Sequence, residues 1–245
     1  MVKKIGLVLA SLLLITGLYV LAYPALNGAL LEHEAESAAE VFLDSLPTPP
    51  PAKENAHESK PTPTPMPYPE LYAAMLQYNQ ELYEQKQTEL TDPWAYEAAG
   101  FDLDAFGMGN AVIGVISIPA LELEMPIYFG ASEDNMAAGT AVLGQTSLPI
   151  GGENTNCVIA GHRGWCGAAY FQFINKLEVG DTVSITNLWG TMQYAVTELR
   201  IIQPNEINEE GVAKRKNRYT LFTCKKSRRG HGKAVSRCEK SAQQH

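Results

Sequence analysis

The feature that most constrains this chain of 245 residues is a series of short apolar segments between residues 114 and 224. Glycine, proline or asparagine separates each segment from the next. Short strands at such spacing predict a mainly β domain, built as a closed β-barrel or a sandwich, with one helical insertion at 168–177. The eight predicted strands cover 115–118, 125–128, 142–143, 157–160, 182–186, 192–196, 200–203 and 219–224.

A second constraint lies at the N-terminus, where Lys3 and Lys4 precede an uncharged apolar run over 5–22. This run is long enough to cross or nearly cross a bilayer of about 30 Å, whereas a lone signal-peptide core is usually shorter. The positive-inside rule places the lysines in the cytoplasm and the rest of the chain outside. Cleavage after Ala22 or Ala25 is the secretory alternative, but no clean small-x-small site follows. We therefore expect a single-pass anchor in the cell membrane and an extracytoplasmic domain.

The segments between the apolar run and the strands differ in composition. Residues 31–46 carry Ala, Glu and Leu at helical spacing, whereas 47–69 is dominated by proline, which predicts an extended, semi-rigid stalk. Apolar residues at 70–90 recur every three or four positions and predict an amphipathic helix packed on the domain. The expected organisation is a cytoplasmic N-terminus (1–4), a transmembrane anchor (5–23), a helix and stalk (24–69), a helical segment (70–113), a β-barrel (114–224) and a basic tail (225–245).

Charge is unevenly distributed. The formal net charge is -8, but residues 214–245 hold eleven of the nineteen Lys and Arg residues, against the single acid Glu239. A basic block of this kind is typical of segments that bind nucleic acid or anionic lipid. The extracytoplasmic location argues against nucleic acid, which leaves an anionic wall polymer or the membrane as a partner for the block.

Cys224 is the strongest candidate for chemistry. It ends the segment 219–224, and Lys225, Lys226, Arg228 and Arg229 follow, so nearby positive charge would favour a thiolate nucleophile. The best partner in the sequence is His162, which lies in a glycine-flanked turn just after a predicted strand. An imidazole with a pKa near 6.5 suits proton transfer at neutral pH, although a surface-loop histidine is the plain alternative.

The four cysteines also permit other readings. In an oxidising compartment Cys157, Cys166, Cys224 and Cys238 suggest disulfides, which composition alone does not exclude. The spacing Cys157-x4-His162-x3-Cys166, with Cys224, also offers four zinc ligands. Structural zinc sites usually have tighter spacing, and alternation would point the mid-strand Cys157 away from the turn, so we expect no metal.

Several motifs, in this order along the chain, resemble the signature of sortases, and in particular of class C sortases, which polymerise pilins. The resemblance covers 114–224, and its ending Thr-Leu-Phe-Thr-Cys is highly specific. Asp92-Pro93-Trp94, further upstream, is similar to the lid motif with which class C sortases cover their own active site. The matching motifs are Pro126-Ile127-Tyr128, the stretch 146–152 (TSLPIGG), Ala160-Gly161-His162-Arg163-Gly164, Leu177-x2-Gly180-Asp181 and Thr220-Leu221-Phe222-Thr223-Cys224.

The resemblance implies a transpeptidase with a sortase-like closed barrel and no metal or organic cofactor. Cys224 would attack the Thr-Gly bond of an LPXTG-type sorting signal, and an amine of a pilin lysine or of a cell-wall precursor would resolve the thioacyl intermediate. His162 would serve as general acid toward the leaving amine and as general base toward the incoming one. Trp94 would pack over Cys224 in the closed state, and Asp92 would engage the cation of the site.

The sequence departs from the family directly after Cys224. The family places an arginine on the following strand, whereas the corresponding position holds Lys233, which lacks the planar guanidinium fork. The tail also lacks the apolar alternation of a final strand, which suggests a shifted reading frame or a degraded gene end. On that basis we expect an unpaired barrel edge, reduced stability and little turnover.

Two alternatives remain open for the departure. In a divergent but working tail, the catalytic cation would come from one of three arginines: Arg228, Arg229 or Arg237. In the other case the protein is a non-catalytic, surface-anchored β-barrel, either a decayed sortase or a binding module.

Overall fold

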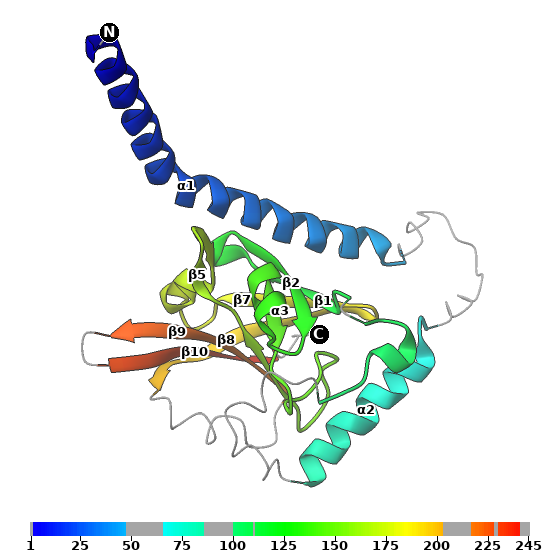
Figure 1. Ribbon diagram of the computed structural model, residues 1–245. Coiled ribbons are helices and arrows are strands. Elements are labelled where there is room, and N and C mark those ends of the chain that lie inside the picture. Colours follow the sequence, from blue (N-terminus) through cyan, green and yellow to red (C-terminus); the bar gives the residue numbers. More distant parts are fainter. Residues whose placement is uncertain are drawn as a thin grey trace, which may run out of the picture.

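The computed structural model describes residues 2–47, 66–85, 100–109, 111–202, 217–227 and 230–240, and for 2–3, 202, 224–227 and 230–240 it describes the backbone alone. A β-barrel forms the body of the molecule, and two longer helices, α1 and α2, lie on its outside (Figure 1). The mainly β barrel predicted from the sequence is confirmed.

Eight strands form a closed ring. Two of the neighbouring pairs, β2 with β3 and β4 with β9, are parallel, and the other six are antiparallel. In ring order the strands are β1 (Gly114–Ile118), β2 (Leu123–Phe129), β3 (Thr140–Val142), β4 (Asn156–Ala160), β9 (Arg218–Ser227), β10 (Gly230–Lys240), β8 (Gly190–Ile202) and β7 (Thr182–Asn187), which pairs back to β1.

The barrel interior is filled by side chains from alternate positions of the strands. Five fully buried aliphatic residues from five different strands meet in one hydrophobic cluster, and Tyr194 packs against Tyr219 in a T-shaped contact with ring centroids 4.5 Å apart. Burying one such aliphatic side chain stabilises the fold by roughly 1.5–3 kcal/mol. The five aliphatic residues are Ile116, Ile127, Ile159, Ile185 and Leu221.

Short helices and one hairpin connect the strands. The predicted helical insertion at 168–177 is partly wrong, because Ala168–Tyr170 pairs as strand β6 with β5 (Arg163–Trp165) and only the residues after it are helical. The short helices are η2 (Asp104–Phe106), η3 (Pro119–Leu121), α3 (Glu133–Ala138) and η4 (Phe171–Lys176).

The end of the chain corrects the largest error of the sequence analysis. Residues 230–240 form β10, which has ten paired positions with β9 and eight with β8, so the predicted unpaired edge is wrong. Antiparallel pairing uses backbone N–H and C=O groups, and these are present whatever the side chains are. The lack of alternating apolar residues in the tail therefore does not mean that the final strand is absent. The predicted segment 200–203 is likewise no separate strand, because 200–202 continues β8.

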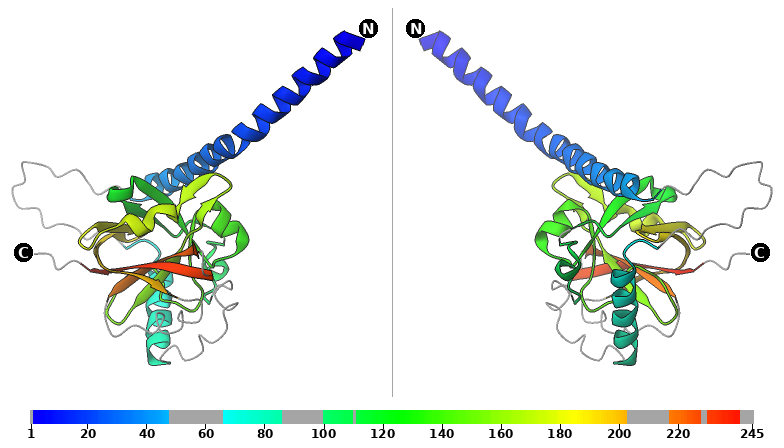
Figure 2. Two further views of the ribbon diagram at one scale, coloured as in Figure 1. Left: turned by 90° about the vertical axis from the view of Figure 1, so that its left-hand side faces the viewer. Right: turned by 90° about the vertical axis from the view of Figure 1, so that its right-hand side faces the viewer.

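α1 (Val2–Ser45) is one continuous helix where the sequence predicted an anchor and a separate helix. Its N-terminal part projects away from the barrel, and its C-terminal part lies across the barrel (Figures 1 and 2). The helix bends between these parts (Figure 1). It contains one proline, Pro24, and a proline inside a helix removes a backbone hydrogen bond and is a common cause of a bend. Ala35, Ala39 and Phe42 are buried in the docked part.

α2 (Pro69–Glu84) confirms most of the predicted amphipathic helix. Leu71 and Met75 enter the barrel cluster, and the amide of Asn79 bonds both the N–H (2.7 Å) and the C=O (3.4 Å) of Leu148. Most of the predicted stalk, at 48–65, lies outside the described residues. Because α1 contacts the barrel before that segment begins, the segment links two helices that both pack on the barrel.

Candidate active site

The parallel pair β4 and β9 brings the two predicted catalytic residues to one place. Pairing extends beyond the end of β4, because the N–H of Gly161 donates to the carbonyl of Phe222 (3.0 Å). The Thr223 hydroxyl in turn donates to the carbonyl of Gly161 (2.8 Å). Ala160 pairs with Phe222, and His162 and Cys224 each lie two residues further along, so the register brings their backbones near each other just beyond the end of β4, while β9 continues to Ser227.

His162 is half-buried rather than a free surface-loop residue. Its ring stacks on Trp165 with centroids 4.4 Å apart and an angle of 9° between the planes. Burial disfavours the charged imidazolium and lowers the pKa of His162 from its ordinary 6.5, while the negative charge of Glu133 opposes this shift. The imidazole is therefore neutral and oriented at neutral pH, as a general base requires.

The turn that holds His162 is fixed by close backbone packing. A Cβ at Gly161 would lie 2.6 Å from Cγ of Phe171, so no larger residue fits without moving the aromatic ring. The N–H of Phe171 donates to the carbonyl of His162 at 2.9 Å. The glycine before the histidine thus serves packing, and Phe171 holds the loop from the other side.

The register of β10 gives the backbone positions of Lys233 and of one candidate arginine, Arg237, relative to Cys224. Lys233 is the residue paired with Cys224, and Arg237 is paired with Thr220. Four residues along a strand span about 13 Å, so Arg237 lies too far along the strand to meet the position of the cysteine. Lys233 therefore occupies the register position nearest the candidate nucleophile.

The remaining predicted site residues fall outside the described part of the chain. These are the lid residues Asp92, Pro93 and Trp94, and the alternative cations Arg228 and Arg229. The lid stays a prediction from the sequence.

The structure places Cys157 and Cys166 in different surroundings. Cys157 is buried inside the barrel, where burial raises the pKa of its thiol, whereas Cys166 is exposed at the turn between β5 and β6. Both are free thiols. Within the described ranges no group of three His, Cys, Asp or Glu side chains is arranged to hold a metal ion.

Two neighbours of His162 were not identified from the sequence. Trp165 follows the histidine by three residues, and its proximity in sequence would have been a usable signal. Glu133 comes from α3, about thirty residues upstream, and nothing in the local sequence indicated that this helix lies near the histidine.

Comparisons with known proteins agree with this geometry. A family model described as the sortase domain matches residues 116–241, slightly more than half of the chain, and it includes β10. Sortase A of Bacillus anthracis is 30% identical over 151 residues, which cover 58% of this chain and 67% of that protein.

Solved structures of similar proteins are class C sortases. Sortase C of Clostridium perfringens, solved with the C-terminal cell wall sorting motif, is 30% identical, with a TM-score of 0.57 over 70% of this chain and 88% of that one. Sortase C1 of GBS Pilus Island 1 is 28% identical, with a TM-score of 0.61 over 71% of this chain and 88% of that one.

Proposed function

Because this chain belongs to the sortase family, a family of cysteine transpeptidases, we propose that it cleaves an LPXTG-type sorting signal and joins the product to an amine. The observation that supports this proposal is the parallel register of β4 and β9, in which Ala160 pairs with Phe222 two residues before His162 and Cys224. A fold alone would not support an activity, but this pairing supplies the two groups that thiol chemistry needs.

The reaction proceeds in two acyl transfers. The neutral imidazole of His162 first takes the thiol proton of Cys224. The resulting thiolate attacks the carbonyl carbon of the scissile Thr-Gly bond, and the C–N bond breaks as the His162 imidazolium passes this proton to the leaving amine. The acyl group is then a thioester on Cys224. An incoming amine attacks this thioester and gives its proton to the neutral His162, the C–S bond breaks, and the thiolate is restored.

Lys233 is the cation that the register offers to the developing oxyanion. A lysine supplies a point charge but not the two parallel N–H groups of an arginine, so we expect weaker stabilisation of the transition state. The motif Asp92-Pro93-Trp94 would act as a lid, with Trp94 over Cys224 and Asp92 engaging the cation of the site.

The similar proteins support the choice of substrates. The Clostridium perfringens sortase C was solved with a cell wall sorting motif, and the group B streptococcal sortase C1 belongs to a pilus island. We propose the same class of donor here, a protein with a C-terminal sorting signal, and a pilin lysine or a cell-wall precursor amine as acceptor.

Membrane anchoring is part of the proposal. Among the described helices, one is long and apolar enough to cross a membrane, and its most apolar window is not buried in the fold. With Lys3 and Lys4 on the cytoplasmic side, the barrel would lie outside the cell.

The test uses the full chain in detergent micelles and a thiol-reactive mimic of an LPXTG-type peptide. Because Cys166 is exposed, the reference protein carries Cys166→Ser and Cys238→Ser to remove labelling elsewhere. We expect covalent labelling of Cys224 and transfer of a fluorescent LPXTG-type donor to an added amine. Cys224→Ala should abolish both, and His162→Ala should abolish transfer. A folded barrel with no labelling and no transfer would instead identify a non-catalytic binding protein.

A further inference from the structure

The hairpin that follows His162 has a turn that other parts of the molecule must hold in place. β5 and β6 are joined by Cys166 and Gly167, which have φ values of 47° and 103°. Two residues with positive φ form the type of turn that suits a two-residue hairpin, but a cysteine at such a position is strained. Strained residues persist where surrounding contacts determine their conformation.

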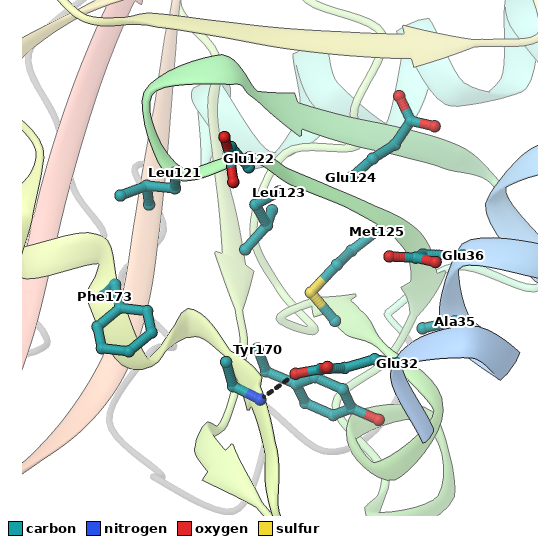
Figure 3. A pocket seen from close by; sticks show the side chains of 11 residues that line it. Glu32, Ala35, Glu36, Leu121, Glu122, Leu123, Glu124, Met125, Tyr170 and Phe173 are labelled. Carbon is teal, nitrogen blue, oxygen red and sulfur yellow. Dashed lines mark hydrogen bonds between the residues drawn. The ribbon is translucent and has the colours of Figure 1, made fainter. Parts of the chain in front are cut away.

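α1 supplies these contacts. The Asn27 side-chain N–H donates to the carbonyl of Cys166 at 3.0 Å. One turn further along the helix, a Glu32 carboxylate oxygen accepts from the N–H of Ala169 in β6 at 2.7 Å, as Figure 3 shows. The helix therefore binds the hairpin at its turn and on β6.

Near these two bonds the backbones of the helix and the turn lie in close contact. A Cβ at Gly28 would lie 2.3 Å from the carbonyl carbon of Gly167, and a Cβ at Gly167 would lie 1.8 Å from the carbonyl oxygen of Pro24. Neither position can accept a larger residue unless helix and turn move apart. The docking of α1 at this point thus depends on two glycines.

The same hairpin orients the histidine of the active site. Trp165, the last residue of β5, stacks on His162, and Phe171, just after β6, bonds the carbonyl of His162. A shift of the turn would therefore reach the imidazole through both arms of the hairpin.

We propose that the docked part of α1 positions the catalytic histidine, with Asn27, Gly28 and Glu32 as positioning residues that act through the β5–β6 turn. This inference rests on the role proposed above for His162. It makes the helix that enters the membrane a structural part of the active site, because the same continuous helix contains the apolar run and the contacts to the turn.

The contact between α1 and the β5–β6 hairpin involves few residues, so single substitutions can test it. Beside Glu32, a cavity of about 210 Å³ separates α1 from the loop between η3 and β2 (Figure 3). Glu36 lines this cavity one helical turn beyond Glu32 and is exposed. Glu36 is therefore a matched control for Glu32, on the same helix and with the same charge.

The first experiment does not depend on activity. The full chain is labelled with 13C-histidine in micelles, and the His162 resonance is identified by its loss in His162→Gln. Gly28→Ala should shift or broaden this resonance, whereas Gly17→Ala, with no atom within 4 Å of the added Cβ, should leave it unchanged. Alanine raises helix propensity, so an effect of Gly28→Ala reports lost docking and not a weakened helix.

The second experiment measures single-turnover formation of the thioacyl enzyme. Glu32→Ala should lower its rate by on the order of 10-fold or more, because small displacements of a catalytic group are costly. Glu32→Gln keeps an acceptor oxygen and should restore most of the rate, and Glu36→Ala should leave the rate unchanged. Thermal unfolding of each variant checks that the barrel is intact.

The outcomes separate the two proposals. If the His162 resonance and the rate are the same in Gly28→Ala and Glu32→Ala as in the parent protein, α1 does not position the histidine. If the parent protein shows no transfer at all, the proposed function fails, while the resonance in Gly28→Ala still decides whether the helix positions the imidazole.

Discussion

The strand that carries Cys224 has two unlike neighbours in the barrel. On one side β4 is apolar and buried, and side-chain bonds such as that from Thr223 to Gly161 reinforce the backbone pairing. On the other side β10 is basic and glycine-containing, yet it pairs with β9 over ten positions. The contrast teaches that backbone pairing is sufficient to close this barrel. The proposed catalytic chemistry depends instead on which residue is paired with Cys224 on β10.

Removal of β10 tests most directly whether its backbone pairing closes the barrel. Truncation after Ser227 would leave both β9 and β8 with unpaired edges, and we expect loss of the cooperative thermal transition. Circular dichroism of the full chain and the truncated chain measures this, and a chain that ends at Lys240 is the matched control. An equally sharp transition at the same temperature in the shorter protein would show that β10 is not part of the folded barrel.

The side chain opposite Cys224 offers a way to sharpen the comparison. Lys233→Arg restores a guanidinium fork at the paired position, and we expect kcat/KM for transfer to rise by on the order of 10-fold. Lys233→Gln should lower it, and Lys240→Arg, at the far end of β10, should have no effect. A rate unchanged by both substitutions of Lys233 would move the search for the cation to Arg228 and Arg229.

Loss of a side-chain hydrogen bond between β4 and β9 should lower the stability of the protein. In Thr223→Val the buried carbonyl of Gly161 loses its hydroxyl donor, which we expect to cost about 1–3 kcal/mol of unfolding free energy. Thr182→Val is the matched control, because Thr182 is exposed on β7 and surface changes usually stay within about 0.5 kcal/mol. Urea unfolding measures both. Equal free energies of unfolding for the two variants would mean that backbone pairing alone also holds β4 and β9 together.

The sequence predicted the apolar side of the barrel well, since Ile116 and Ile159 lie in short apolar segments that form the buried strands β1 and β4. It failed at β10, because a strand held between two partners through its backbone needs no apolar pattern. It also failed at the expected boundary between residues 23 and 24, because α1 continues through it as one helix with Pro24 inside. Sequence reasoning proposed His162 as the partner of Cys224 from its chemistry and its position after a strand, and the family resemblance supported it. The parallel pairing of β4 with β9 was not predicted, since a long-range pairing leaves no local signal.

The last prediction concerns His162, whose charge state depends on the packing that β5 provides. Burial holds the pKa of the imidazole below 6.5 in the folded protein, so the unfolded chain binds more protons just below that pH. This contribution to stability is therefore fully present above pH 6.5 and is lost as the pH falls toward the folded pKa. Trp165→Ala removes a covering ring and should raise the pKa of His162 toward 6.5. An NMR titration measures the shift, with Trp189→Ala on the distant β7–β8 turn as control. A lower pKa in Trp165→Ala would show that Glu133, and not burial, dominates at the histidine.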